Sequence, residues 1–325
     1  MKKEPLIHGG ILEMKNGNNI SIGIVSISSI GETKYPIQYN QAIVQIRKKF
    51  GNNITEYKAS HDEIKNRARL FMKAIVKNNV VITTIGGMTA VEILPYLDFN
   101  KISTLKTILL GYSDISIVLN AIVSISKKKT FLGPMVIPSF GEHPEPCYET
   151  LTSLTKSIEN KTQKLLPFKY EICETIDWDS KEWGTRARNK SAPRAQLWNN
   201  LDYKVIGRII GGNADSLISI LNTEYLRVEA GDILFFEDNN ISEGNWRRNM
   251  MTYYLSGMFN KIGALVFGKT NTSLSFSQMD NFLKEIGVNT PRVFGIDFGH
   301  TDPFYTIPIG GEAKIDFLKK TIEVV

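Results

Sequence analysis

Short apolar runs alternate with amphipathic segments along the first half of this chain. The runs at 20–26, 80–85 and 107–110 have the length and composition of buried strands. Between the first two runs, apolar residues recur at helical spacing over 43–50 and 64–75. Because parallel strands need crossover connections, which are usually helices, this alternation predicts an α/β fold with a doubly wound parallel sheet. Ligands bind such sheets beyond the carboxyl ends of the strands.

A second set of strands and helices is expected after residue 200. Amphipathic patterns predict helices over 246–259 and around 282–286. Gly211-Gly212-Asn213 has the composition of a turn that ends the first strand of this set. The apolar runs expected to form strands cover 205–210, 232–238, 264–267 and 293–296.

The stretch from about 140 to 200 shows neither the apolar period of a helix nor that of a strand. We therefore expect it to be irregular, with 1–165 and 201–325 forming two domains joined by a connecting and substrate loop at 166–200. Tryptophans beside arginines suit a planar, anionic ligand such as a nucleotide, but they equally suit a linker whose long side chains lie along the surface. The residues concerned are Trp178, Trp183, Arg186, Arg188 and Arg194.

Composition and charge exclude several classes of protein. The chain has 325 residues, of which 42% are hydrophobic and 22% charged, as is ordinary for a globular protein with room for two domains. Its net charge is +6, but the lysines are scattered, so we expect no nucleic-acid partner. The first residues lack the apolar segment of a signal peptide, and the run at 20–30 is too short to span a bilayer. We expect a cytoplasmic protein without membrane contact.

Cysteine and histidine spacing indicates no metal site. Cys147 and Cys173 cannot form a disulfide framework, and no His/Cys cluster has the spacing of metal ligands. Two of the four histidines, His8 and His61, are most simply surface residues, whereas His143 lies in a proline-containing stretch that fits a loop beside a site.

The strongest candidate for a reactive residue is Ser113. It follows the apolar run at 107–110 and precedes an apolar, helix-like stretch, which is the pattern of a strand, a sharp turn and a helix. A serine at such a turn presents its hydroxyl above the sheet, and the N–H of Asp114 lies at the positive end of the helix. Ile115 stands where the G-x-S-x-G motif has its second glycine, and a Ser-Asp pair before a helix also serves as an N-cap, so the motif alone leaves both roles open.

Two further strand ends carry the partners that a nucleophilic serine needs. Glu237 is one of the two acids that end the run at 232–238, and His300 follows a glycine after the run at 293–296. A hydroxyl, an imidazole that takes its proton and a carboxylate that orients the imidazole are the parts of an acyl-transfer triad. Asp238 lies next to Glu237, so the sequence leaves open which carboxylate faces the histidine.

Gly86 and Gly87 follow the run at 80–85 and belong to the same expected edge of the sheet. A glycine pair there allows the backbone to approach a ligand and to direct N–H groups at it, although a tight turn explains the pair equally well.

Several blocks together resemble the serine peptidase family of LD-carboxypeptidases, in the family's order and over most of the chain. Within that family, Gly133–Pro144 and Ile176-Asp177-Trp178 are similar to the branch of microcin C7 self-immunity proteins. The family blocks are Ile85-Gly86-Gly87, Leu94–Asp98, Gly111-Tyr112-Ser113-Asp114, Gly211-Gly212-Asn213, Leu234–Asp238 and Gly299-His300-Thr301.

The resemblance implies a catalytic triad of Ser113, Glu237 and His300. It also implies an oxyanion hole formed by the backbone N–H groups of Gly87 and Asp114, and a stacking contact between Trp178 and the aromatic part of the substrate. The implied fold has an N-terminal doubly wound parallel-sheet domain and a smaller, β-rich α/β C-terminal domain, with the active site between them. A homodimer without metal or cofactor is implied as well.

Two departures from the family affect the expected substrate. Met88 follows the double glycine where the family usually has an acid, so the substrate contact of that acid is absent or replaced. The segment 239–248, with Glu243, Arg247 and Arg248, does not align clearly.

The resemblance therefore implies a serine hydrolase that cleaves the amide between an acyl amino acid and a nucleotide-like group. The alternative within the family is an LD-carboxypeptidase that removes a D-amino acid from a murein tetrapeptide. An alternative of another class is a non-catalytic protein that binds a nucleotide or peptide.

Overall fold

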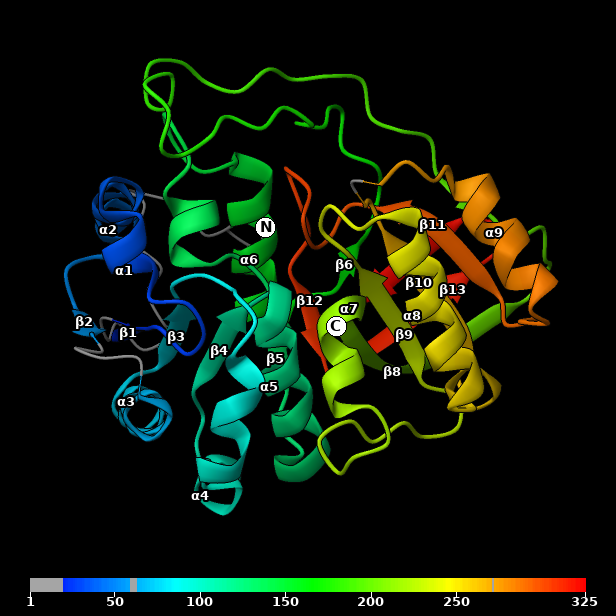
Figure 1. Ribbon diagram of the computed structural model, residues 1–325, viewed down its shortest axis with the longest axis horizontal. Coiled ribbons are helices and arrows are strands. Elements are labelled where there is room, and N and C mark those ends of the chain that lie inside the picture. The colour runs from blue at the N-terminus through cyan, green and yellow to red at the C-terminus, as the bar shows by residue number, and fades with distance from the viewer. Residues whose placement is uncertain (1–19, 59–62, 271) are drawn as a thin grey trace, which may run out of the picture.

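Two β-sheets lie next to each other in the computed structural model, which describes residues 20–58, 63–270 and 272–325 (Figure 1). His8 and His61 lie outside the described residues. None of the helices in the described part is long and apolar enough to cross a membrane.

The first sheet has six strands in the order β12-β5-β4-β3-β1-β2. Its strands β1 to β5 run parallel, and β12, from the end of the chain, pairs antiparallel with β5. The strands are β1 (Ile22–Val25), β2 (Ile54–Tyr57), β3 (Val80–Thr83), β4 (Ile108–Gly111), β5 (Thr130–Leu132) and β12 (Ile307–Ile309).

Helices cover both faces of this sheet, because successive side chains of each strand point to opposite faces. Ile24 packs in one apolar cluster with α2, and its neighbour Val25 packs in the other with α3 and α5. The doubly wound fold expected from the sequence is therefore confirmed. The helices and single turns of this part are α1 (Gly31–Lys34), α2 (Pro36–Phe50), α3 (Ile64–Lys77), η1 (Ala90–Tyr96), α4 (Phe99–Ser103), η2 (Ser113–Ile115), α5 (Ser116–Ala121), η3 (Ile122–Ser126), η4 (Val136–Phe140) and α6 (Tyr148–Ile158).

The second sheet has eight strands in the order β6-β14-β13-β8-β9-β10-β11-β7, and the four strands β8 to β11 are parallel. The strands are β6 (Gln163–Lys164), β7 (Leu197–Trp198), β8 (Lys204–Asn213), β9 (Ile233–Glu237), β10 (Ala264–Gly268), β11 (Arg292–Ile296), β13 (Glu312–Asp316) and β14 (Thr321–Val324). The accompanying helices are α7 (Ala214–Leu217), η5 (Ile218–Ile220), α8 (Glu243–Leu255), η6 (Met258–Asn260) and α9 (Phe276–Glu285).

The turn expected at Gly211-Gly212-Asn213 is wrong, because β8 continues through all three residues. A Cβ atom on Gly211 would lie 3.0 Å from the backbone nitrogen of Phe235, and both glycines have positive φ, of 119° and 139°. These glycines let β8 lie close to β9 and to the neighbouring helix, so they extend a strand instead of ending it.

The irregular stretch expected from about 140 to 200 is also wrong in part, since α6 is a regular helix. The side chains that α6 buries are Thr150, Ser153, Leu154 and Ser157, so its buried face is mostly hydroxyl-bearing. Between β6 and β7, the chain from 165 to 196 has no strand or helix apart from one isolated bridge.

Two strands lie in the sheet of the other expected domain. β12 comes from the C-terminal segment but completes the first sheet, and β6 comes from the N-terminal segment but lies at the edge of the second. The division at 165 and 200 stays a prediction. The segment between β6 and β7 starts at one edge of the second sheet and ends at the opposite edge.

Candidate active site

The carboxyl ends of strands from both sheets meet at one cavity of about 460 Å³. Ser113 follows β4, Gly87 follows β3, and His300 follows β11. This is where ligands bind open parallel sheets. The lining residues are Ser29, Lys34, Tyr35, Ile85, Gly86, Gly87, Tyr112, Ser113, Met135, Pro138, Glu142, His143, Thr175, Ile176, Trp178, Trp183, Gly184, Arg186, Arg188, Asn239, His300, Thr301 and Asp302.

Ser113 has a backbone conformation that non-glycine residues seldom adopt, with φ of 63°. The residue stands between β4 and η2, which leads directly into α5. A Cβ atom on Gly86 would lie 2.6 Å from the Ser113 hydroxyl oxygen, so only glycine fits beside it. Strained turns of this kind are concentrated at functional sites, and this one directs the serine into the cavity.

Glu237 and His300 form a tight pair. His300 Nδ1 lies 2.5 Å from Glu237 Oε2, and the backbone N–H of His300 donates to the same oxygen at 3.1 Å. The Glu237 side chain is fully buried, whereas the His300 side chain remains 15% exposed at the cavity. A buried carboxylate on Nδ1 fixes the ring and its tautomer and leaves Nε2 to act in the cavity.

Asp238 faces away from the histidine. Its Oδ1 accepts a hydrogen bond of 3.2 Å from the backbone N–H of Asp215, the first acid of α7. Burial, and then the charge of Glu237, raise the pKa of Asp238 well above its ordinary value. Of the two neighbouring acids, Glu237 is therefore the one that contacts His300.

The His300 ring is also held from its side by Tyr112, the residue before the serine. The two ring centres are 4.9 Å apart, and the rings meet edge to face. Ser113 and His300 line the same cavity, and no hydrogen bond joins their side chains within the described part of the chain. Such bonds are often long in ligand-free enzymes and shorten when substrate binds.

The loop after β3 packs tightly against the loop after β1. A Cβ atom on Gly87 would collide with the hydroxyls of Ser28 and Ser29, so the backbone of Gly87 lies directly on these serines. Gly87 lines the cavity next to Ser113, and the N–H of Asp114 belongs to the first turn after the nucleophile position. The two expected oxyanion donors are thus on neighbouring loops.

Trp178 lines the cavity and is held in place by α1 and α2. Its ring meets the Tyr35 ring edge to face at 4.8 Å, and its carbonyl accepts a hydrogen bond of 2.9 Å from Gln38 Nε2. Trp183 lines the cavity as well, where its ring lies 6.1 Å from that of His143. An aromatic surface with a fixed orientation is therefore present beside the serine.

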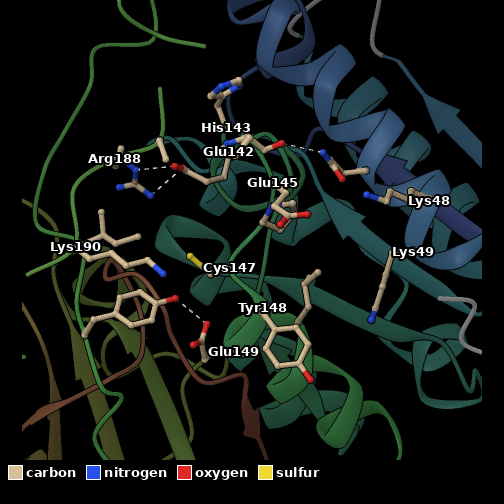
Figure 2. Close-up of a pocket in the computed structure, with 17 residues that line it drawn as sticks. Lys48, Lys49, Glu142, His143, Glu145, Cys147, Tyr148, Glu149, Arg188 and Lys190 are labelled. Atoms are coloured by element: carbon tan, nitrogen blue, oxygen red, sulfur yellow. Dashed lines mark hydrogen bonds and ion pairs between the residues drawn. The ribbon is translucent and has the colours of Figure 1, made fainter. Parts of the chain in front are cut away.

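The arginines of the loop are engaged in ion pairs. Arg188 binds both oxygens of Glu142 at 2.8 Å and Asp302 at 2.6 Å, as the dashed lines to Glu142 in Figure 2 show in part. Arg186 pairs with Glu174 and Glu182. Arg194 binds Glu171 and lies outside the cavity lining. The sequence left a ligand-binding and a structural role open for these arginines, and their contacts are those of the structural role.

The other residues singled out by the sequence lie away from the cavity. Met88 is 89% exposed and does not line the cavity. Arg247 pairs with Glu243 on α8 and lies over the Phe282 ring, so the segment 239–248 contributes Asn239 alone to the lining.

Sequence reasoning missed Ser28, Tyr35 and Asn239. Ser28 follows β1 just as Ser113 follows β4, so a serine beyond a buried strand was the available signal. Nothing in the local sequence marks Tyr35 or Asn239, because their place depends on how distant segments pack.

A second cavity of about 710 Å³ lies beside the first and shares Glu142, His143 and Arg188 with it (Figure 2). Cys147 lines this second cavity, and burial raises the pKa of its thiol to about 12. A thiol that stays protonated is a poor nucleophile, so we expect no nucleophilic role for Cys147. Within the described residues, no group of His, Cys, Asp and Glu side chains is arranged to hold a metal ion.

Known proteins resemble this chain in sequence and in structure. The family model for the LD-carboxypeptidase N-terminal domain matches residues 22–133, and that for the C-terminal domain matches 206–315. The microcin C7 self-immunity protein MccF of Escherichia coli is 33% identical over 274 residues, covering 80% of this chain and 78% of MccF. A carboxypeptidase-like protein of Vibrio cholerae is 29% identical over 270 residues, covering 80% of each chain.

Solved structures of MccF superimpose on this chain with a TM-score of 0.86 at 28% identity. In the complex of MccF with glutamyl sulfamoyl guanosine, the match covers 94% of this chain and 96% of MccF. Another of these structures holds aspartyl sulfamoyl adenosine. Since both family models match and MccF is 33% identical over most of both chains, this chain is a serine peptidase that belongs to the LD-carboxypeptidase family.

Proposed function

We propose that this peptidase hydrolyses the amide between an acyl amino acid and a nucleotide-like group, with Ser113 as the nucleophile. The observation that carries the proposal is the 2.5 Å contact between Glu237 and His300 at the cavity into which the strained Ser113 turn opens. These are the residue types and partners that serine-dependent acyl transfer requires.

The first half of the reaction forms an ester. The Ser113 hydroxyl attacks the acyl carbonyl while His300 takes its proton, and Glu237 stabilises the imidazolium through Nδ1–H. The tetrahedral intermediate then collapses, the C–N bond breaks, and His300 returns the proton to the leaving nitrogen. The acyl group remains on Ser113.

The second half releases the acid. A water molecule loses a proton to His300 and attacks the ester, and the proton returns to the Ser113 oxygen as the carboxylic acid leaves. In both halves, the N–H groups of Gly87 and Asp114 would stabilise the negative oxygen of the intermediate. Removing one such donor commonly costs about 10²- to 10³-fold in turnover.

Trp178 supports a nucleotide-like leaving group. Its ring is fixed by Tyr35 in the cavity, and a planar base stacks favourably on such a surface. By similarity, the MccF structures with sulfamoyl adenosine and sulfamoyl guanosine ligands also support a nucleotide-like leaving group. We further propose a cytoplasmic homodimer that needs no metal or cofactor, so that a chelator should leave turnover unchanged.

An LD-carboxypeptidase remains the second candidate, because both family models carry that description. A terminal D-amino acid would present a carboxylate, and Lys34 lines the cavity beside Tyr35 and Trp178. The third reading, a non-catalytic binding protein, keeps the site but lacks turnover.

A mass-spectrometric turnover assay separates these candidates. Wild-type protein is offered a processed microcin C7 analogue and a murein tetrapeptide, and the products are identified. Release of the nucleotide part is expected. Release of D-amino acid alone would replace the proposal by the carboxypeptidase, and binding of either compound without turnover would favour the third reading.

Variants at Trp178 test the substrate assignment. Trp178→Ala should raise KM for the nucleotide substrate about 5- to 150-fold, because stacking is worth about 1–3 kcal/mol per base, whereas Trp178→Phe should keep most of the affinity. Turnover of a substrate without an aromatic group is the control, and an equal loss there would contradict a stacking role.

A further inference from the structure

The carboxylate of Asp114 is not used in the proposed mechanism, although it belongs to the residue next to the nucleophile. The side chain is 1% exposed and does not line the cavity. Burial raises its pKa, and the Ser28 hydroxyl and the N–H groups of the loop after β3 act in the opposite direction. A buried carboxylate without an ion pair in the described residues is costly, so its contacts need an explanation.

Those contacts join the nucleophile turn to the two loops beside it. Asp114 Oδ2 accepts a hydrogen bond of 2.6 Å from the Ser28 hydroxyl and one of 3.2 Å from the backbone N–H of Ala90. The Ser28 hydroxyl oxygen in turn accepts from the N–H of Thr89 at 3.2 Å. One carboxylate therefore connects the loop after β1, the loop after β3 and the turn after β4.

Gly87 lies in the middle of this arrangement. The hydrogen bonds to Thr89 and Ala90 hold the chain just after Gly87, and the Gly87 backbone itself packs on Ser28. The position of the Gly87 N–H relative to the Asp114 N–H thus depends on the bond between Ser28 and Asp114. An oxyanion hole stabilises charge only when its donors are already directed at one point.

A buried arginine holds both the loop that carries Ser28 and the loop after β3. Arg67, on α3, donates at 2.9 Å to the carbonyl of Ile27 and at 2.9 Å to the hydroxyl of Thr89. The loops on both sides of Ser28 are therefore supported by the core of the first sheet, and the Asp114 carboxylate extends this support to the nucleophile turn.

We propose that the Asp114 carboxylate, acting through Ser28, is a positioning group. It fixes the distance between the two N–H donors of the oxyanion hole and their direction relative to each other. This inference rests on the proposed function, since the Asp114 carboxylate has this role only if Ser113 is the nucleophile. It predicts that breaking the bond lowers turnover and leaves substrate affinity nearly unchanged.

The test compares Ser28→Ala with Ser26→Ala. Ser26 is a matched control, because its buried hydroxyl also donates to a carboxylate, Glu32 Oε2, at 2.5 Å, but it does not contact the nucleophile turn. Ser28→Ala and Asp114→Asn should each lower kcat about 10- to 100-fold with KM within about 2-fold, and the double variant should lose little more than Asp114→Asn alone. Ser26→Ala should keep kcat within about 2-fold.

A fluorophosphonate probe gives a readout that does not depend on the natural substrate. As Ser113 attacks the phosphorus and fluoride leaves, negative charge develops on the phosphoryl oxygen in the oxyanion hole, so the labelling rate should fall in Ser28→Ala and remain in Ser26→Ala, at thermal midpoints that match. Equal labelling rates in the two variants, or a rise in KM at constant kcat, would overturn the inference alone. A wild-type protein whose Ser113 is not labelled would remove the proposed nucleophile and this inference together.

Discussion

At the scale of single residues, small side chains next to the reactive groups decide the geometry of the site. Gly299 precedes His300 and has φ of 81°, and a Cβ atom there would lie 2.5 Å from Cβ of Glu237. The backbone N–H of His300 can therefore donate to the Glu237 carboxylate only because residue 299 has no side chain. The contact that orients the histidine depends on this glycine.

Gly299→Ala should lower kcat at least about 10-fold, because the added methyl group displaces Glu237 from His300. Gly287→Ala is the matched control: Gly287 has φ of 86°, and the nearest atom to an added Cβ, the Tyr254 hydroxyl, lies 3.6 Å away. Each variant should lose about 1–2 kcal/mol of stability from the positive φ. If denaturation and initial-rate measurements showed equal kcat in both variants, the steric argument would be incorrect.

The sequence could predict the residues of the candidate site that follow apolar strands. Ser113, Glu237 and His300 each end or follow such a run, and the structure brings all three to the meeting point of the two sheets. It could not show that Met88 points to solvent or that Arg188 is occupied by Glu142, because those facts depend on contacts between distant segments.

At the scale of elements, hydroxyl groups replace apolar contacts where the chain passes from His300 to β12. Thr150 and Ser153 of α6 accept hydrogen bonds from the backbone N–H groups of Phe304 and Thr306, at 3.0 and 2.9 Å. These bonds fix the segment that follows His300. The same face of α6 also buries Leu154 in the apolar cluster that contains α2, so it both binds backbone and packs in the core.

The segment between β6 and β7 is held by side chains. Lys269, which is almost fully buried, pairs with Glu171 at 2.8 Å and with Asp297 at 2.5 Å. Farther along, Arg188 joins the segment to Glu142 and Asp302. A segment whose regular backbone pairing is limited to one isolated bridge needs such contacts to keep Trp178 beside Ser113.

Arg188→Met should destabilise the protein by about 3 kcal/mol, because it leaves two largely buried carboxylates without their cation. Arg186→Met is the control: the ion pairs of Arg186 are much more exposed, and such pairs contribute less than about 1 kcal/mol. Hydrogen exchange over 174–188 should rise in the first variant and change little in the second. Equal effects on unfolding in guanidinium would show that Arg188 is not the main contact.

At the scale of the whole molecule, the acid next to Glu237 affects the pH dependence of stability. The pKa of Asp238 is raised in the folded protein by burial and by Glu237. Above about pH 4, the ordinary value for an aspartate, the unfolded chain loses this proton while the folded protein keeps it. The folded state then binds more protons, so this group lowers the free energy of unfolding as the pH rises toward its folded pKa.

Asp238→Asn removes that dependence and keeps an oxygen to accept from the N–H of Asp215. The variant should gain stability relative to wild type between pH 5 and pH 8, by up to about 1.4 kcal/mol per pH unit. Urea denaturation at the two pH values measures the difference. If the free energies of unfolding of the two proteins differed by the same amount at both pH values, the pKa of Asp238 would not be raised in the folded protein.

The proposed function depends on Ser113, where both sheets, the buried pair of Glu237 and His300 and the aromatic side of the cavity come together. Turnover of a processed microcin C7 analogue by wild type and by Ser113→Ala, followed by mass spectrometry, tests it most directly. A fall of at least about 10³-fold in Ser113→Ala, with binding retained, is the predicted result. Near-full turnover without the Ser113 hydroxyl would contradict the proposed function.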